Sequence, residues 1–135
     1  PLREETREEP PREDPQAETD ADRALEQCAN FASSGNYSAT IESCQNAVRA
    51  NPRNSDAYTY LGKAHYELGD IDSAINFLQQ AVRLDGRNRT ALSALGAARQ
   101  DAGDNDGARE AYERYLEINP DSRYAAEVRS ILESL

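Results

Sequence analysis

The sequence predicts an all-α protein in which helical hairpins repeat in tandem to form an α-solenoid. A step of 34 residues separates three glycines and also three further helix-terminating residues: Gly35, Gly69 and Gly103, and Pro52, Gly86 and Pro120. Apolar residues on both sides of each glycine recur at spacings of three and four, which is the period of an amphipathic helix. A fixed period of this length is typical of repeat architectures.

The first twenty residues differ in composition from the rest. Residues 1–20 carry four of the six prolines and eight acids against three arginines. Such a stretch buries too little apolar surface to offset its ordering entropy. We therefore interpret residues 1–20 as a disordered, acidic, Pro-rich linker. The functional alternative is an acidic docking tail for a basic partner.

The folded domain is expected to span residues 21–135. Its three repeats align without a gap and occupy residues 21–54, 55–88 and 89–122. Each repeat divides at its glycine into two helices, such as DAYTYLGKAHYEL and SAINFLQQAVRL on either side of Gly69. Gly69 suits a helix end because glycine adopts the left-handed conformation without steric cost. Asp70 and Asp72 suit the positive N-terminus of the next helix.

Residues 123–135 are predicted to form a seventh helix. Its apolar residues fall on one stripe: Tyr124, Val128, Ile131, Leu132 and Leu135. A solenoid needs a terminal unit that covers its open end. We therefore expect this helix to cap the stack.

The middle repeat resembles the tetratricopeptide repeat (TPR) family, whose pattern is W-x2-L-G-x2-Y followed by A-x3-F, A and P. Its matching residues are Tyr58, Leu61, Gly62, His65, Ala74, Leu78, Ala81 and Gly86. The third repeat matches at Leu92, Leu95, Gly96, Arg99, Ala108, Tyr112, Tyr115 and Pro120. The first repeat aligns as Ala24, Gln27, Cys28, Phe31, Thr40, Cys44, Ala47 and Pro52, and it departs from the pattern at Gln27, Cys28 and Thr40. The resemblance implies a right-handed superhelical stack of three hairpins with a capping helix.

Two mid-helix glycines predict close contact between sister helices. A glycine in a helix interior costs about 1 kcal/mol relative to alanine, which is tolerable where another helix passes closely. The expected facing pairs are Gly62 with Ala74, Gly96 with Ala108 and, in a bulkier version, Cys28 with Thr40.

The two cysteines are open to three interpretations. Cys28 and Cys44 are one disulfide, two buried thiols or half of a metal site. We favour two buried thiols, because free cysteine commonly behaves as a small apolar core residue. A disulfide is the alternative, since both cysteines lie equally far from the turn at Gly35 and Asn36. It would stabilise the first repeat and indicate an oxidising compartment.

Composition argues against several partner classes. The net charge of −10 repels phosphate backbones and anionic lipid, so we expect neither nucleic acid nor membrane as a partner. No apolar run approaches the roughly 18 residues of a membrane-spanning helix. The chain starts at Pro1 and contains no Met, so we interpret it as one module of a larger protein. A cytoplasmic location is favoured, with a periplasmic or secreted one if Cys28 and Cys44 are bridged.

No enzyme motif is visible. The sequence lacks GxSxG, GxxxxGK[ST] and any His/Cys/Asp/Glu cluster at metal-ligand spacing, so we expect no catalytic residue, cofactor or metal. His65, the sole histidine, occupies an aromatic position of the repeat and is interpreted as a residue of a helix seam. The acids after each turn are interpreted as helix-start residues: Asp70, Asp72, Asp104 and Asp106.

The resemblance to TPR proteins implies that the first helix of each hairpin lines a concave, partner-binding groove. The residues expected there are Leu25, Ala29, Thr59, Lys63, Tyr66, Ser93, Ala97 and Gln100, with Glu26, Glu67 and Asp101 on the flanks. Tyr66, with Tyr60 beside it, is the candidate anchor, because aromatics give contact area at low entropy cost. The alternative is that Tyr66 is a partly buried seam residue.

The family's carboxylate-clamp members grip acidic chaperone tails with paired Lys/Arg and Asn. The matching positions here hold Leu25, Ala29, Tyr60, Thr90 and Ala94. We therefore expect a protein or peptide ligand with apolar and basic residues, and not an acidic chaperone tail.

The favoured function is a non-enzymatic scaffold that binds a peptide or helix of a partner protein in the concave groove. The alternative is self-association through the exposed first repeat or the capping helix. A monomer is favoured over a homo-oligomer.

Overall fold

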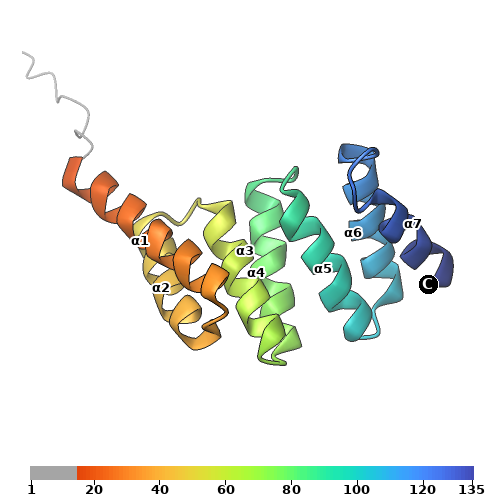
Figure 1. Ribbon diagram of the computed structural model, residues 1–135, viewed down its shortest axis with the longest axis horizontal. Helices are drawn as coiled ribbons and strands as arrows, with labels where there is room; N and C mark the ends of the chain where they lie inside the picture. The colour runs from red at the N-terminus through yellow and green to blue at the C-terminus, as the bar shows by residue number, and fades with distance from the viewer. Residues whose placement is uncertain (1–14) are drawn as a thin grey trace, which may run out of the picture.

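The computed structural model describes residues 15–135, and this part of the chain is a row of three helical hairpins closed by a last helix (Figure 1). The helices are α1 (Pro15–Ser34), α2 (Tyr37–Ala50), α3 (Ser55–Glu67), α4 (Ile71–Leu84), α5 (Arg89–Asp101), α6 (Asn105–Ile118) and α7 (Ala125–Ser134). Within residues 15–135 there is no strand. The predicted all-α solenoid of three hairpins and a seventh helix is confirmed.

The turn inside each hairpin is built as the glycine period predicts. Gly35, Gly69 and Gly103 have φ values of 74°, 83° and 80°, a conformation that strains other residues. The amide of Asp70 then donates to the carbonyl of His65 at 2.9 Å, which satisfies a free group at the helix end. The Asp70 carboxylate accepts from the amide of Ser73 at 3.3 Å and caps α4.

Helix α1 begins earlier than the predicted boundary between linker and domain. Residues 1–14 lie outside the described residues, but residues 15–20 of the predicted linker are helical. The helix begins at Pro15, where the missing amide hydrogen costs nothing because the first helical amides have no partner inside the helix. Proline counts against order in a composition argument, yet at this position it is compatible with a helix start.

The close contacts between sister helices differ from the predicted pairs. A Cβ atom on Gly62 would lie 2.5 Å from Cγ of Leu78 and 3.2 Å from the carbonyl oxygen of Ala74. The three atoms nearest to such a Cβ on Gly96 all belong to the ring of Tyr112, and not to Ala108 as expected. Each glycine therefore receives a large side chain from the sister helix rather than facing a small one.

Cys28 and Cys44 form a disulfide, so the favoured interpretation as two free thiols is wrong. The S–S distance is 1.96 Å, the Cα atoms are 4.6 Å apart, and both residues are fully buried. The two cysteines are 16 residues apart, the same separation as Gly62 and Leu78. The bridge thus occupies the place where a glycine meets a large side chain in the second hairpin. The expected partner of Cys28, Thr40, instead donates its hydroxyl to the carbonyl of Asn36 at 2.7 Å.

Helix α7 lies against the last hairpin at the C-terminal end of the row (Figure 1). Val128 is buried with Tyr112 and Tyr115, and three of the four other residues of the predicted stripe pack on that cluster: Ile131, Leu132 and Leu135. Tyr124 is an exception to the predicted stripe, because 55% of it is exposed. It precedes the helix, and its ring lies beneath the guanidinium of Arg123 at 5.4 Å.

Candidate functional site

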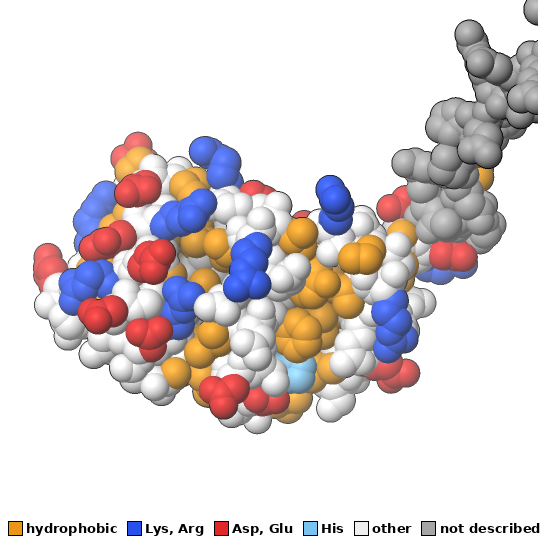
Figure 2. Space-filling model, turned by 180° about the vertical axis from the view of Figure 1, so that it is seen from behind, with side chains coloured by type: hydrophobic (Ala, Val, Ile, Leu, Met, Phe, Trp, Pro, Cys, Tyr) orange, Lys and Arg blue, Asp and Glu red, His pale blue; other side chains and the backbone are white. Residues whose placement is uncertain are grey.

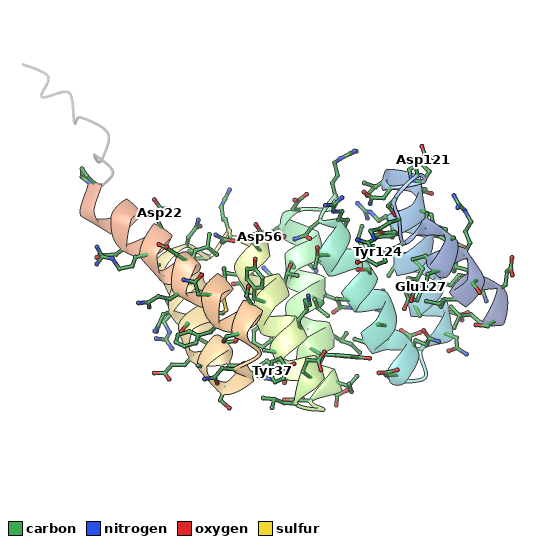
Figure 3. All side chains as sticks on the ribbon, viewed as in Figure 1. Asp22, Tyr37, Asp56, Asp121, Tyr124 and Glu127 are labelled. Carbon is green, nitrogen blue, oxygen red and sulfur yellow. A yellow bond between two sulfur atoms is a disulfide. The ribbon has the colours of Figure 1, made fainter. Side chains whose placement is uncertain are left out.

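The first helices of the hairpins, α1, α3 and α5, line a groove along one side of the molecule. At one end a hollow of about 250 Å³ lies between α1 and α3, where Asp22 and Asp56 project (Figure 3). A second hollow of about 240 Å³ lies between α3 and α5, and a third of about 280 Å³ extends toward Tyr37. Because Tyr60, Lys63 and Glu67 are shared between hollows, the three are continuous. We call them together the inner groove.

Six of the eight predicted site residues line the inner groove. Leu25 and Ala29 line the hollow beside α1, and the hollow between α3 and α5 contains the other four: Lys63, Tyr66, Ser93 and Ala97. Ala29, Lys63 and Ala97 occupy the same position in consecutive repeats, so one helical face recurs at each step of 34 residues.

The other two predicted residues face the interior. Thr59 is only 3% exposed; its hydroxyl donates to the carbonyl of Ser55 at 2.9 Å and accepts from the side-chain amide of Asn88 at 3.1 Å. Gln100 accepts, through its side-chain carbonyl, a hydrogen bond of 3.4 Å from the hydroxyl of Tyr112. Both side chains therefore tie helices together instead of lining a hollow.

Sequence reasoning missed the acids at the end of the inner groove. Asp22 and Asp56 line it one position after the start of their repeats, and Asp56 lies in the first turn of α3. Their shared repeat position was the available signal. With Glu26 and Glu67 they bring four carboxylates to the groove lining, against the single ammonium of Lys63. The groove is therefore acidic.

The structure offers no alternative centre of chemistry in its described part. His65 stacks on Phe77 with ring centroids 5.2 Å apart, and its Nδ1 lies 3.4 Å from the carboxylate of Asp70. This confirms its place in a packing seam. Residues 15–135 contain no group of three side chains placed to hold a metal ion, and none of their helices is both long and apolar enough to cross a bilayer.

A family model described as "Tetratricopeptide repeat" matches residues 31–98 and 66–131. The chain belongs to the tetratricopeptide repeat family. Comparison with curated proteins finds no match.

Solved TPR structures share the fold along most of this chain. The first TPR of Spaghetti (RPAP3), bound to the HSP90 peptide SRMEEVD, is 27% identical, with a TM-score of 0.78 over 86% of this chain and 93% of that one. The crystal structure of MamA is 26% identical, with a TM-score of 0.78 over 88% and 70%. The Arabidopsis OM64 TPR domain, at 18% identity, has a TM-score of 0.81 over 87% and 98% and shows likeness in fold alone.

Tyr66, the candidate anchor of this TPR groove, also ties two repeats together. Its ring packs beside the cluster that contains Leu95 and Ala98, and its hydroxyl donates to the carboxylate of Asp101 on α5. This hydrogen bond, together with burial and the nearby negative charges, raises the pKa of Tyr66 from 10.0 to about 12. Both interpretations given to Tyr66 thus apply, since the side chain lines the groove and packs in a seam.

The raised pKa of Tyr66 predicts a loss of stability at alkaline pH. The folded state holds the phenolic proton more tightly than the unfolded state, whose value is about 10. This contribution to stability is therefore complete below about pH 10 and is lost as the pH rises toward 12. Asp101→Asn is expected to lower the pKa of Tyr66, as followed by tyrosinate absorbance, with Tyr66→Phe identifying the signal. An unchanged titration curve in Asp101→Asn would contradict this origin of the shift.

Proposed function

We propose that this TPR chain is a non-enzymatic scaffold that binds an extended segment or a helix of a partner protein in the inner groove. The observation that carries the proposal is the groove itself, which is continuous across α1, α3 and α5 and combines apolar and acidic walls. Tyr60 and Tyr66 supply aromatic contact area within it. Its relatives of known structure include TPR domains bound to peptides of HSP90 and HSP70.

The partner segment is proposed to carry apolar and basic residues. Four carboxylates line the inner groove against one ammonium, and placing like charges opposite one another across an interface costs several kcal/mol. The peptide SRMEEVD, bound by the first TPR of Spaghetti, contains two consecutive glutamates and a final aspartate. Such an acidic segment would meet Asp22 and Asp56 at one end of the groove. We therefore propose that chaperone tails of this type are not ligands.

Charge reversal in the groove tests this proposal. In Glu26→Lys/Glu67→Lys two exposed groove carboxylates become cations, while Glu42→Lys/Glu133→Lys makes the same change in net charge on α2 and α7. Captured with each full-length chain as bait, a cross-linked partner segment should be at least tenfold depleted only with the groove variant. The recovered segment should carry net positive charge.

Two results would contradict the proposal. Equal recovery of the partner by both variants would place the binding site outside the inner groove. Saturable binding of the free peptide SRMEEVD to the unmodified chain, abolished by a substitution in the groove, would show that its acidity does not set the ligand class.

A further inference from the structure

The side of the molecule opposite the inner groove carries a second hollow, between α4 and α6. Its volume is about 200 Å³, and its floor is apolar, formed by Val82, Leu92 and Leu95. An apolar cavity of about 150 Å³ accommodates benzene, so this hollow has room for one aromatic side chain. We call it the outer hollow.

The preceding repeat shows what fills the equivalent place. Between α2 and α4, the ring of Phe77 stacks with Tyr58 at 6.4 Å and with His65 at 5.2 Å between centroids. A shift of 34 residues brings these three positions to Ala111, Leu92 and Arg99, which line the outer hollow. The second seam thus lacks the aromatic stack that the first seam provides from its own sequence. Figure 2 shows the first seam as an apolar patch around the histidine.

The same shift replaces neutral groups with cations around the outer hollow. Gln80 becomes Arg114 and His65 becomes Arg99, while Arg83 follows Arg49. The Arg99 guanidinium is held in place by donating to the carbonyl of Gly107 at 3.1 Å.

These arginines have no acidic partner within the protein. Across residues 15–135, no carboxylate lies within ion-pair distance of Arg83, Arg99 or Arg114. The outer hollow is lined by these three cations and by one acid, Glu110, on a chain whose net charge is −10. Guanidinium groups bind carboxylates in bidentate geometry and also stack on aromatic rings. The hollow is therefore a basic, ring-sized site on an acidic protein.

We propose that the outer hollow is a second docking site, which binds an acidic segment of a partner protein through one aromatic side chain. The ring enters the space that Phe77 fills in the first seam, and flanking carboxylates pair with Arg83 and Arg114. The ligand class is the opposite in charge of the one that suits the inner groove. One chain then holds two different partner segments on its two faces.

The test uses the full chain and a pentapeptide with a central phenylalanine between two aspartates on each side. In an NMR titration, we expect amide shifts concentrated at Val82, Leu95 and Ala111. Ala111→Phe supplies the missing ring and should weaken binding at least tenfold. Arg83→Gln/Arg114→Gln should do the same without touching the core, because both side chains are exposed. Arg49→Gln, at the equivalent position of the first seam, should leave the affinity within twofold of the unmodified chain.

Variants of the probe separate the two parts of the site. Alanine in place of the phenylalanine should weaken binding at least tenfold, and lysines in place of the aspartates should abolish it. Absence of saturable binding at millimolar peptide, or equal binding by Ala111→Phe and Arg83→Gln/Arg114→Gln, would overturn the proposal. So would a concentration-dependent dimer in sedimentation that Ala111→Phe dissociates, because the occupant would then be a second copy. The inner-groove variant Glu26→Lys/Glu67→Lys should bind the probe as the unmodified chain does, which keeps this test independent of the proposed function.

Discussion

Removal of the disulfide by Cys28→Ala/Cys44→Ala is expected to lower the midpoint of thermal unfolding by about 10 °C. In the loop-entropy account, a bridge between residues 16 apart stabilises a protein by about 3 kcal/mol. A loss of 1 kcal/mol shifts the midpoint by roughly 2–8 °C for domains between 60 and 250 residues. Both cysteines are fully buried, so the truncated side chains also leave unfilled space in the core.

The loss should be concentrated in the first hairpin. Each repeat contacts only its neighbours, and the first one has a neighbour on one side only. Hydrogen exchange in the alanine variant should therefore speed up in α1 and α2 well before α5 and α6. Equal acceleration along the whole chain would contradict a local role for the bridge.

The second hairpin suggests a rescue for the bridge. Gly62 and Leu78 occupy the same two positions as Cys28 and Cys44, so Cys28→Gly/Cys44→Leu should repack the first hairpin without sulfur. We expect this pair to recover most of the stability lost in the alanine variant and to make it insensitive to reductant. Failure of the rescue would show that the two hairpins do not share the same helix spacing.

The bridge also bears on where the protein acts. Disulfides persist in oxidising compartments and are rare where thiol reductants are maintained. The pairing of Cys28 with Cys44 therefore favours the periplasmic or secreted location over the cytoplasmic one.

The hairpins were predictable because each depends on residues close together in the sequence. Gly69 ends α3, Asp70 caps α4, and the apolar period of each helix identifies its buried face. The contact between sister helices depends instead on their axial offset and rotation, which local pattern does not contain. Cys28 was therefore matched with Thr40, whereas the aligned repeat positions of Gly62 and Leu78 contained the information needed to pair it with Cys44.

The inner groove was predicted as far as helix position decides exposure. Lys63 and Ala97 line it because the same face recurs in every repeat. Thr59 has an equivalent position on the face, but the side-chain amide of Asn88 from the next repeat reaches its hydroxyl and the residue is buried. Such a contact depends on side-chain reach across the stack, and no spacing rule predicts it.

Leu78→Ala is expected to destabilise the second hairpin by about 3 kcal/mol, because large-to-small changes at fully buried positions cost roughly 2–5 kcal/mol. Gly62→Ala should also destabilise the unmodified chain. It gains about 1 kcal/mol of helix propensity, but its Cβ would overlap Leu78, and overpacking costs about 1–3 kcal/mol.

The two changes should be strongly coupled. With Leu78 truncated, the space above Gly62 opens, and only the carbonyl oxygen of Ala74 remains, 3.2 Å from the new Cβ. Gly62→Ala should then become stabilising, so that the double variant is more stable in urea than Leu78→Ala alone. The matched control is Gly96→Ala, whose new Cβ would meet the ring of Tyr112 instead. It should remain destabilising in the Leu78→Ala chain. If Gly62→Ala costs the same with and without Leu78, the glycine is required by the α4 backbone and not by the side chain packed on it.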